Sequence, residues 1–223
     1  GWAVAVNYAQ DAQAAAQVVS AIQAQGGQAQ AFQANVADED QVMAMFSAID
    51  HQMGRLSGLV NNAGVVDVYA RVDDMSVARL KRMFDVNVLG SFICAREAVR
   101  RMSPKHGGSG GSIVNVSSAA SRIGSPGQYV DYASAKGAID TFTLGLAKEV
   151  AAEGIRVNAV RPGLIDTEIH ASGGLPNRVK DLQHLIPAQR GGTAQEVAQA
   201  IVWLLSDAAS YTTMSLVDVS GGR

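Results

Sequence analysis

The chain has 223 residues, of which 48% are hydrophobic and 17% charged, a composition typical of one globular domain and not of a disordered protein. Its formal net charge is −2, and its 18 Lys and Arg residues are scattered, which argues against a nucleic-acid or membrane-surface partner. The one cysteine, Cys94, has no partner for an internal disulfide, and neither a signal peptide nor an apolar run of transmembrane length is evident. We therefore expect a cytoplasmic protein.

Strand-like and helix-like sequence patterns alternate along the chain. Short apolar, partly β-branched runs bounded by Gly or Asn predict buried parallel strands at residues 3–6, 29–32, 59–60, 112–116, 156–160 and 216–219. Between them, helical patterns occur at residues 11–25, 39–53, 76–101, 132–152 and 193–205. Thr193 with Glu196 three residues later predicts a capping box for the last helix. Strands that alternate with helices indicate an α/β fold, a doubly wound parallel sheet of Rossmann type in a single domain over residues 1–223.

Two segments need separate interpretation. Residues 164–190 form a long stretch without clear periodicity, and so long a loop inside a compact domain predicts a substrate lid. The chain begins with a run, residues 3–8, that corresponds to the second strand of a dinucleotide-binding sheet. We therefore expect the first strand, and the glycine-rich turn that holds a cofactor pyrophosphate, to be absent from this chain. Gly26-Gly27 does not replace that turn, because it follows a helix and is better explained as a helix C-cap.

Tyr132 and Lys136 lie four residues apart at the start of a predicted helix and therefore on one face of it. An ammonium group beside a phenol favours the phenolate and lowers the phenol pKa, which suits a general acid/base. This spacing also arises by chance on many helix surfaces, so its interpretation depends on the surrounding motifs.

Along nearly its whole length the chain resembles the short-chain dehydrogenase/reductase family. The resemblance rests on motifs that occur in the family order: Asn61-Asn62-Ala63-Gly64, Asn87 within residues 85–90, Ser117-Ser118, Tyr132 with Lys136, Arg161-Pro162-Gly163, and residues 218–222. Each motif is weak alone, whereas the ordered set is specific. Within the family, the sequence is most similar to bacterial glucose 1-dehydrogenase-like and 3-oxoacyl reductase-like members.

The resemblance implies catalytic roles for four residues. Tyr132 would exchange a proton with the substrate oxygen, and Lys136 would lower the Tyr132 pKa and hold the cofactor ribose. Ser118 would hydrogen-bond the substrate oxygen, although it lies one residue further from Tyr132 than is usual in the family. Ser117 is the alternative, and we expect its hydroxyl to cap the strand end instead. Asn87 would hold a water that connects Lys136 to solvent.

The resemblance also implies a nicotinamide cofactor. Its contacts would come from Tyr132, Lys136 and residues that follow the strands: Asn7, Tyr8, Asn35, Val36, Asn61, Ala63, Gly64, Pro162, Gly163, Ile165 and Thr167. An acidic residue at the end of the second strand binds the ribose 2′-hydroxyl of NAD and repels a 2′-phosphate. Here Asn7 and Tyr8 occupy that position and the first carboxylate is Asp11, so NADP is favoured over NAD.

The combined prediction is an oxidoreductase that transfers a hydride between NADP(H), or NAD(H), and a small carbonyl or secondary alcohol substrate. By resemblance it would be a homotetramer or homodimer that pairs through the helices at 76–101 and 132–152. The alternative is a non-catalytic nucleotide-binding or scaffold protein on the same fold, which would be expected to lack Tyr132 or Lys136. A third interpretation is that the chain without its glycine-rich turn does not bind a cofactor.

The remaining polar candidates do not form a metal site. Asp67, Tyr69, His170 and His184 lack the spacing of a ligand set, and we expect them to be solvated loop residues. Met214 stands where the family commonly has glycine, which suggests a locally altered turn or a subunit contact.

Overall fold

The structure is a computed structural model that describes residues 1–223, apart from the side chains of His170 and Ser172. Its strands are β1 (Ala3–Tyr8), β2 (Gln28–Gln33), β3 (Gly58–Asn61), β4 (Gly111–Val116), β5 (Ile155–Pro162), β6 (Ile165–Asp166), β7 (Gly192–Thr193) and β8 (Leu216–Val219). Its α-helices are α1 (Ala12–Ala24), α2 (Glu39–Met53), α3 (Val77–Phe84), α4 (Gly90–Met102), α5 (Ala120–Ile123), α6 (Val130–Val150), α7 (Ile169–Ser172), α8 (Arg178–Leu182) and α9 (Ala194–Leu205). Shorter turns are the π-helical η2 (Asp85–Leu89) and the 3₁₀ turns η1 (Val72–Asp74), η3 (Pro104–His106), η4 (Ala151–Glu153), η5 (Gln183–Leu185) and η6 (Asp207–Ala209).

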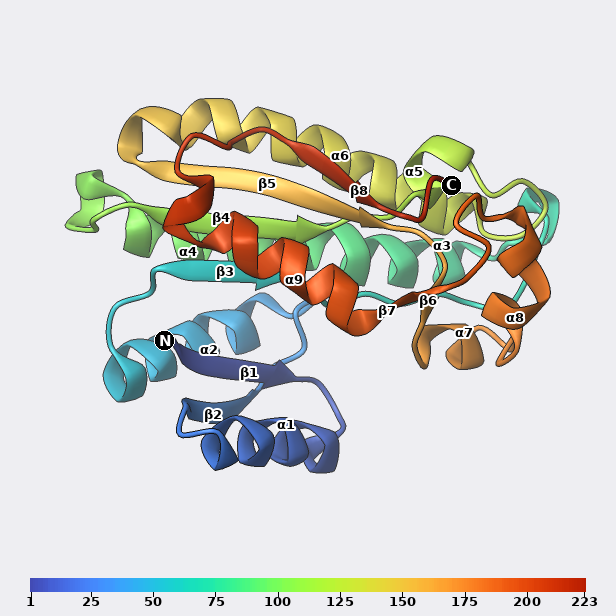
Figure 1. Ribbon diagram of the computed structural model, residues 1–223. Helices are drawn as coiled ribbons and strands as arrows, with labels where there is room; N and C mark the ends of the chain where they lie inside the picture. Colours follow the sequence, from blue (N-terminus) through green and yellow to red (C-terminus); the bar gives the residue numbers. More distant parts are fainter.

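The parallel α/β architecture is confirmed. β3, β4, β5 and β8 form one parallel sheet in that order, with Leu59 opposite Ile113. β1 and β2 form a second parallel pair, with Val4 opposite Ala29. Within the described chain no strand pairing joins β1 to β3, and this break lies where the first strand was expected to be absent. Figure 1 shows the β1–β2 layer beside β3, with α1 on its outer side.

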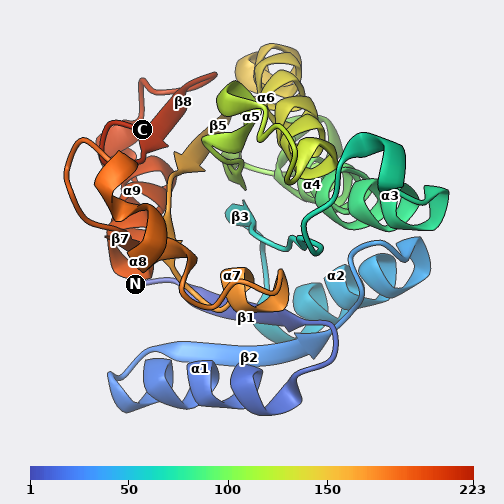
Figure 2. The same ribbon diagram turned by 90° about the vertical axis from the view of Figure 1, so that its right-hand side faces the viewer.

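Helices cover both faces of the larger sheet (Figures 1 and 2). On one face α2, α4 and α6 bury a core that includes Phe46, Ile93 and Val157. On the other face α9 covers a smaller core around Val114 and Leu204. Most residues of β4 and β5 are buried, which explains why these two strands read as near-continuous apolar runs in the sequence. The burial predicted for residues 3–6 is wrong, because β1 has no buried residue.

The helix predicted at residues 76–101 is present and runs without a gap from α3 through η2 to α4. It contains a π-helical turn, η2, in which Asn87 is completely buried. The Asn87 amide donates to the carbonyl oxygen of Met83 at 2.9 Å. π-Helical turns are rare and occur frequently at functional sites. The apolar periodicity continues across the turn, so the sequence pattern alone did not reveal it.

Residues 164–190 are also more ordered than predicted. They contain β6, α7, α8 and η5, and Ile165 of β6 pairs with Gly192 of β7. Each element is too short to show a period in the sequence. The segment is held to the body by side chains such as Ile186, which is fully buried.

Most element ends follow the predicted local signals. Thr193 and Glu196 form the predicted capping box of α9, and Gly26 has φ +78° at the end of α1, as a C-cap requires. Met214 has φ +62°, a backbone conformation that suits glycine, and a methionine there lowers the stability of the fold by about 1 kcal/mol.

None of the described helices combines the length and apolar character that a membrane span requires.

A buried ion pair fixes the start of α6 against α3. The Arg79 guanidinium donates to both carboxylate oxygens of Asp131, with Nε···Oδ2 at 2.8 Å and Nη2···Oδ1 at 3.3 Å. The Asp131 side chain is fully buried, and Arg79 also donates to the carbonyl oxygen of Val68. Because Asp131 directly precedes Tyr132, this pair positions the first turn of the helix that carries Tyr132 and Lys136.

Replacing Asp131 with alanine leaves the Arg79 charge buried without its partner, so we expect the free energy of unfolding to fall by about 3–5 kcal/mol. Asp73→Ala is the matched control, because Asp73 pairs with Arg71 in a solvent-exposed ion pair and its loss should cost less than about 1 kcal/mol. Urea unfolding of both variants measures the difference. Equal losses would contradict a positioning role for the buried pair.

Candidate active site

A cavity of about 1100 Å³ opens at the carboxyl ends of β3, β4 and β5, which face the viewer in Figure 2. In parallel sheets this edge is the usual ligand site. The volume exceeds the roughly 300–1000 Å³ of a typical small-molecule pocket, so it can accept two bound groups side by side. Nine of the predicted site residues line it: Ala63, Gly64, Ser118, Tyr132, Lys136, Pro162, Gly163, Ile165 and Thr167.

The structure brings Tyr132 and Lys136 together. Both lie in the first half of α6, and the Lys136 ammonium is 5.6 Å from the centre of the Tyr132 ring. Lys136 is 4% exposed, and its Nζ donates to the carbonyl oxygen of Val116 at 2.7 Å. This hydrogen bond holds the ammonium at the carboxyl end of β4.

The two neighbouring serines have different environments. The Ser117 hydroxyl is buried and donates to the carbonyl oxygen of Lys136 at 3.1 Å, so it joins the end of β4 to α6. The Ser118 hydroxyl accepts from the amide of Ala120 at 3.1 Å and hydrogen-bonds Tyr132. These contacts support Ser118 as the candidate for the substrate oxygen and agree with the structural role predicted for Ser117.

Burial shifts the pKa values of both members of the pair. It raises the pKa of Tyr132, and the hydrogen bond from Ser118 only partly offsets that rise. It lowers the pKa of Lys136 to about 8, against the opposing effect of the Asp140 carboxylate. The sequence predicted a lowered Tyr132 pKa, and this prediction is wrong, because burial of the phenolate raises the pKa by more than the hydrogen bond with Ser118 lowers it.

Gly64 allows the loop after β3 to approach Lys136. A Cβ atom on Gly64 would lie 2.9 Å from Asn87 Oδ1 and 3.6 Å from Lys136 Nζ, so the three groups meet at one point. Asn87 holds this loop from the π-helical turn, since its Oδ1 accepts from the Val65 amide and its Nδ2 donates to the Val65 carbonyl. The Asn87 side chain therefore has protein partners, and the predicted water relay stays a prediction.

Asn61 is turned away from the cavity. Its amide donates to Asn115 Oδ1 at 2.9 Å and to the carbonyl oxygen of Ser91 at 3.2 Å, inside the layer between sheet and helices. The Asn115 amide continues this chain to the Thr143 hydroxyl at 2.9 Å. The Asn61 side chain thus connects β3 to β4 and α4. The sequence predicted that it would contact the cofactor.

The other predicted cofactor residues lie on or beside the β1–β2 layer and outside the cavity wall. The Asn7 amide donates to the carbonyl oxygen of Ala34 at 3.0 Å, and Tyr8 ends β1. Asn35 accepts from the amide of Ala37, and Val36 packs against Gly90. Their role in cofactor binding stays a prediction.

The four polar residues that the sequence predicted to be solvated loop positions differ in their surroundings. Asp67 forms an ion pair with Arg82, Tyr69 packs edge-on against the Tyr129 ring, and His184 is solvent-exposed. The side chain of His170 lies outside the described part of the structure. Across the described side chains, no group of three His, Cys, Asp or Glu is placed to hold a metal ion.

Several cavity residues were not singled out from the sequence. Asn62, Val66 and Leu164 line the wall beside predicted positions, and Tyr129 and Arg178 face the cavity as well. Tyr129 is the N-cap residue of α6 and has a non-helical backbone, so helical spacing did not indicate it. Arg178 comes from the short helix α8, which carried no periodic signal.

Comparisons with known proteins agree with this geometry. The family model described as enoyl-(acyl carrier protein) reductase matches residues 1–223. An uncharacterised oxidoreductase of Escherichia coli, YgfF, is 59% identical over 223 residues, which are 100% of this chain and 90% of the relative. A solved mutant form of a Serratia marcescens short-chain dehydrogenase/reductase is 31% identical with a TM-score of 0.90, covering 100% of this chain and 87% of that one. The chain belongs to the short-chain dehydrogenase/reductase family.

This membership confirms the predicted family and places the chain among oxidoreductases. A second solved structure, a blue fluorescent protein from a metagenomic library in complex with NADPH, is 27% identical with a TM-score of 0.88. The match covers 100% of this chain and 87% of that protein. The shared fold therefore extends over the whole chain described here.

The depressed Lys136 pKa predicts a pH-dependent stability. The unfolded chain, with an ordinary lysine pKa of 10.5, binds this proton up to higher pH than the folded chain, with a pKa of about 8. Stability should therefore rise with pH between these values, by about 2 kcal/mol from pH 7 to 9.5. Urea unfolding at both pH values, compared with Lys136→Met, isolates this contribution. A rise of the same size in Lys136→Met would assign it to other groups.

Proposed function

We propose that this chain is an NADP(H)- or NAD(H)-dependent oxidoreductase that interconverts a small carbonyl compound and a secondary alcohol, with Tyr132 as general acid/base. The observation that carries the proposal is the convergence of Tyr132, Lys136 and Ser118 on one cavity wall. The cavity lies at the sheet edge where dinucleotides bind. This combination supports catalysis better than a purely structural role.

Tyr132, Ser118 and Lys136 would each have a separate role in the reaction. The Tyr132 hydroxyl would give a proton to the substrate oxygen during reduction and take it back during oxidation. The Ser118 hydroxyl, which already reaches Tyr132, would hydrogen-bond the same oxygen and stabilise its negative charge. Lys136, with a pKa lowered to about 8, would be fully protonated beside a phenolate, because an adjacent negative charge favours the ammonium.

The cavity fits a nicotinamide cofactor, which supplies the hydride when it is bound. Lys136 and Asn62 offer polar groups on its wall, and Gly64 and Gly163 contribute backbone to it. Gly163 is already packed against Ser220, where a Cβ atom would lie 2.8 Å from the Ser220 Cα. Residues 164–190 would act as the substrate lid, because Leu164, Ile165 and Arg178 contribute directly to the wall.

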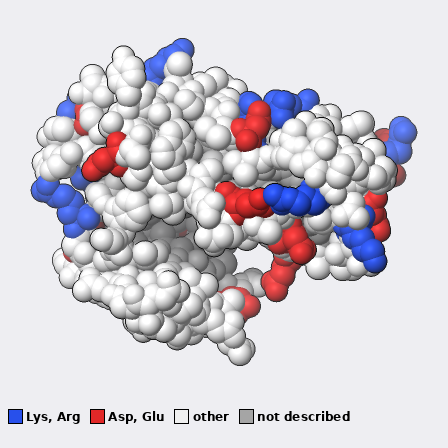
Figure 3. All heavy atoms as spheres, in the orientation of Figure 1, with Lys and Arg blue, Asp and Glu red and all other residues white. Residues whose placement is uncertain are grey.

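The charge around β1 supports NADP(H) as the preferred cofactor. Asp11 is the only charged side chain among residues 1–37, and the corresponding part of the surface in Figure 3 is almost entirely uncharged. The Asp11 carboxylate accepts from the Ala14 amide at 2.8 Å as the N-cap of α1. It is therefore committed to the helix, and no carboxylate at the end of β1 would repel a 2′-phosphate.

Tyr132→Phe in the full-length protein should lower kcat/KM for an accepted ketone by at least about 100-fold, since general acid/base catalysis typically contributes that much. NADPH affinity should be unchanged, because the ring and its neighbours remain. Absorbance at the NADPH band over a panel of ketones and aldehydes, with NADH in parallel, measures activity and cofactor preference together.

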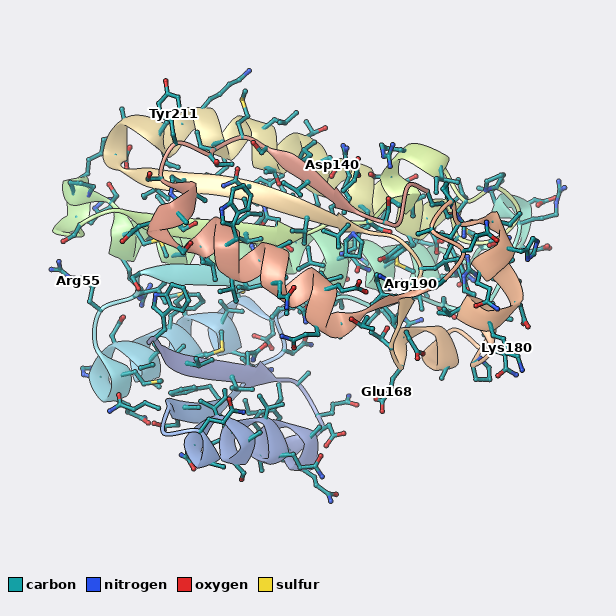
Figure 4. All side chains as sticks on the ribbon, viewed as in Figure 1. Arg55, Asp140, Glu168, Lys180, Arg190 and Tyr211 are labelled. Atoms are coloured by element: carbon teal, nitrogen blue, oxygen red, sulfur yellow. The ribbon has the colours of Figure 1, made fainter. Side chains whose placement is uncertain are left out.

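The matched control is Tyr211→Phe. Tyr211 is fully exposed and lies at the end of the molecule away from the cavity (Figure 4), so its hydroxyl should not affect turnover. Substantial ketone reduction by Tyr132→Phe would refute the proposed role of Tyr132.

We also propose that copies of the chain associate through α4 and α6, as a homodimer or homotetramer. Phe92 of α4 stacks on Phe142 of α6 with ring centres 3.8 Å apart, yet 45% of Phe92 is exposed, and Leu89 beside it is similarly exposed. An exposed apolar cluster of this kind marks an interaction surface. The cytoplasmic location remains a prediction from the sequence.

Phe92→Glu should lower the solution mass, measured by light scattering after size-exclusion chromatography, because it places a charge in the buried centre of the interface. Val18→Glu on α1 is the control, since it changes an equally exposed apolar residue outside the proposed interface. An unchanged mass for Phe92→Glu would exclude this face as the contact.

A further inference from the structure

Arg178 is held over the cavity by neutral partners. Its guanidinium lies 5.0 Å from the centre of the Tyr129 ring and 5.5 Å from that of Tyr69. Nη1 donates to the Tyr69 hydroxyl at 2.5 Å and Nη2 to Gln128 Oε1 at 3.0 Å. Two aromatic faces and two neutral acceptors orient the cation without neutralising it.

A second guanidinium reaches the same cavity. Arg223 lines its wall, and its Nη1 is buried without a hydrogen-bond partner in the described structure. Its backbone oxygen accepts from Arg122 Nη2 at 3.1 Å, which anchors the residue beside α5. A buried, unpaired N–H of a charged group is unfavourable unless a ligand satisfies it.

The two arginines repel each other. Burial lowers the pKa of Arg223, and the positive charge of Arg178 lowers it further. Among the described side chains neither forms an ion pair with a carboxylate, unlike Arg161, which pairs with Asp140. Two unpaired guanidinium groups on one cavity wall create a local positive potential that favours an anion.

Acidic residues near the cavity do not fill this role. Asp166 and Glu168 also contribute to the wall, but both are solvent-exposed. Glu168 points away from the body of the protein in Figure 4. No described carboxylate forms an ion pair with either arginine, although Arg178 and Arg223 line the same cavity.

We propose that Arg178 and Arg223 bind a carboxylate or phosphate group of the carbonyl substrate, so that the enzyme selects anionic substrates. This inference rests on the proposed function. The arginines contact Arg122, Gln128 and Tyr129, which lie between Ser118 and Tyr132 in the chain. Ser118 and Tyr132 are the two residues proposed to hydrogen-bond the substrate oxygen. Neither arginine contacts Gly64 or Lys136 among the hydrogen bonds and ring contacts described.

The planar guanidinium suits this task. It can donate two parallel hydrogen bonds to a carboxylate or phosphate, which gives both affinity and a fixed orientation. Besides its hydrogen bonds to Tyr69, Gln128 and Tyr129, the Arg178 guanidinium has further N–H groups that could reach an anion. Anchoring the anionic end of the substrate there would place its carbonyl end toward Tyr132 in the same cavity.

The first test measures binding without turnover. Calorimetric titration of the full-length protein, saturated with NADPH, uses inorganic phosphate and malonate as probes for the two anion types. We expect saturable binding of at least one probe, weakened at least ~10-fold by Arg178→Met, because a charge-assisted contact is lost. Tyr132→Phe should bind the probe normally.

The second test measures selectivity in turnover. Acetoacetate is compared with its methyl ester, and dihydroxyacetone phosphate with dihydroxyacetone. We expect kcat/KM to favour the anionic member of a pair at least ~10-fold, and Arg178→Met to raise KM for that member while leaving the neutral one unchanged. Lys180→Met is the matched control, since Lys180 lies on the same helix and points outward in Figure 4. Arg178→Lys, which keeps the charge but loses the fork, should fall between wild type and Arg178→Met.

The outcomes separate the two proposals. Equal kcat/KM for charged and neutral substrates, or probe binding unaffected by Arg178→Met, would overturn the anion site while leaving the oxidoreductase intact. A parallel loss of NADPH affinity in Arg178→Met would also overturn it, by assigning the anion to the cofactor. Probe binding that depends on Arg178 without reduction of any carbonyl would support the site and refute the proposed function.

Discussion

The arrangement of the site depends on one buried ammonium group. Lys136 can remain in the interior only because the end of β4 presents the carbonyl oxygen of Val116 to it and the Asp140 carboxylate lies one helical turn away. Asp140 in turn accepts from Arg161 at the end of β5, and Figure 4 places it above the sheet. The helix and the two strand ends are thereby joined through charged and polar groups at the place where the cavity begins.

A layer of buried polar side chains supports this arrangement from beneath. The chain from Asn61 through Asn115 to Thr143 crosses β3, β4 and α6 with its hydrogen bonds satisfied. Such networks specify one relative placement of the elements, since any slip would leave several buried groups unpaired. Asn61, the last residue of β3, therefore contributes by fixing the geometry of the strands and not as part of the cavity wall.

The sequence predicted the parts of the molecule that depend on strong local patterns. The alternation of strands and helices, the capping box at Thr193 and the pair of Tyr132 and Lys136 all follow from residue types at fixed spacing. The π-helical turn at Asn87 was not predictable, because its apolar pattern resembles that of a continuous helix. The direction of the Tyr132 pKa shift and the position of Arg178 depend on burial and on contacts between distant segments, which spacing does not encode.

Among the described strands β1 and β2 pair only with each other, so no strand pairing joins them to the larger sheet. The β1–α1–β2 unit is held to the larger sheet by side-chain packing, with Phe32 and Ala34 in contact with the same core as Phe46. Because Phe32 and Ala34 share one buried core with Phe46 and with Val157 of β5, the loss of the Phe46 side chain would weaken the packing of both parts at once.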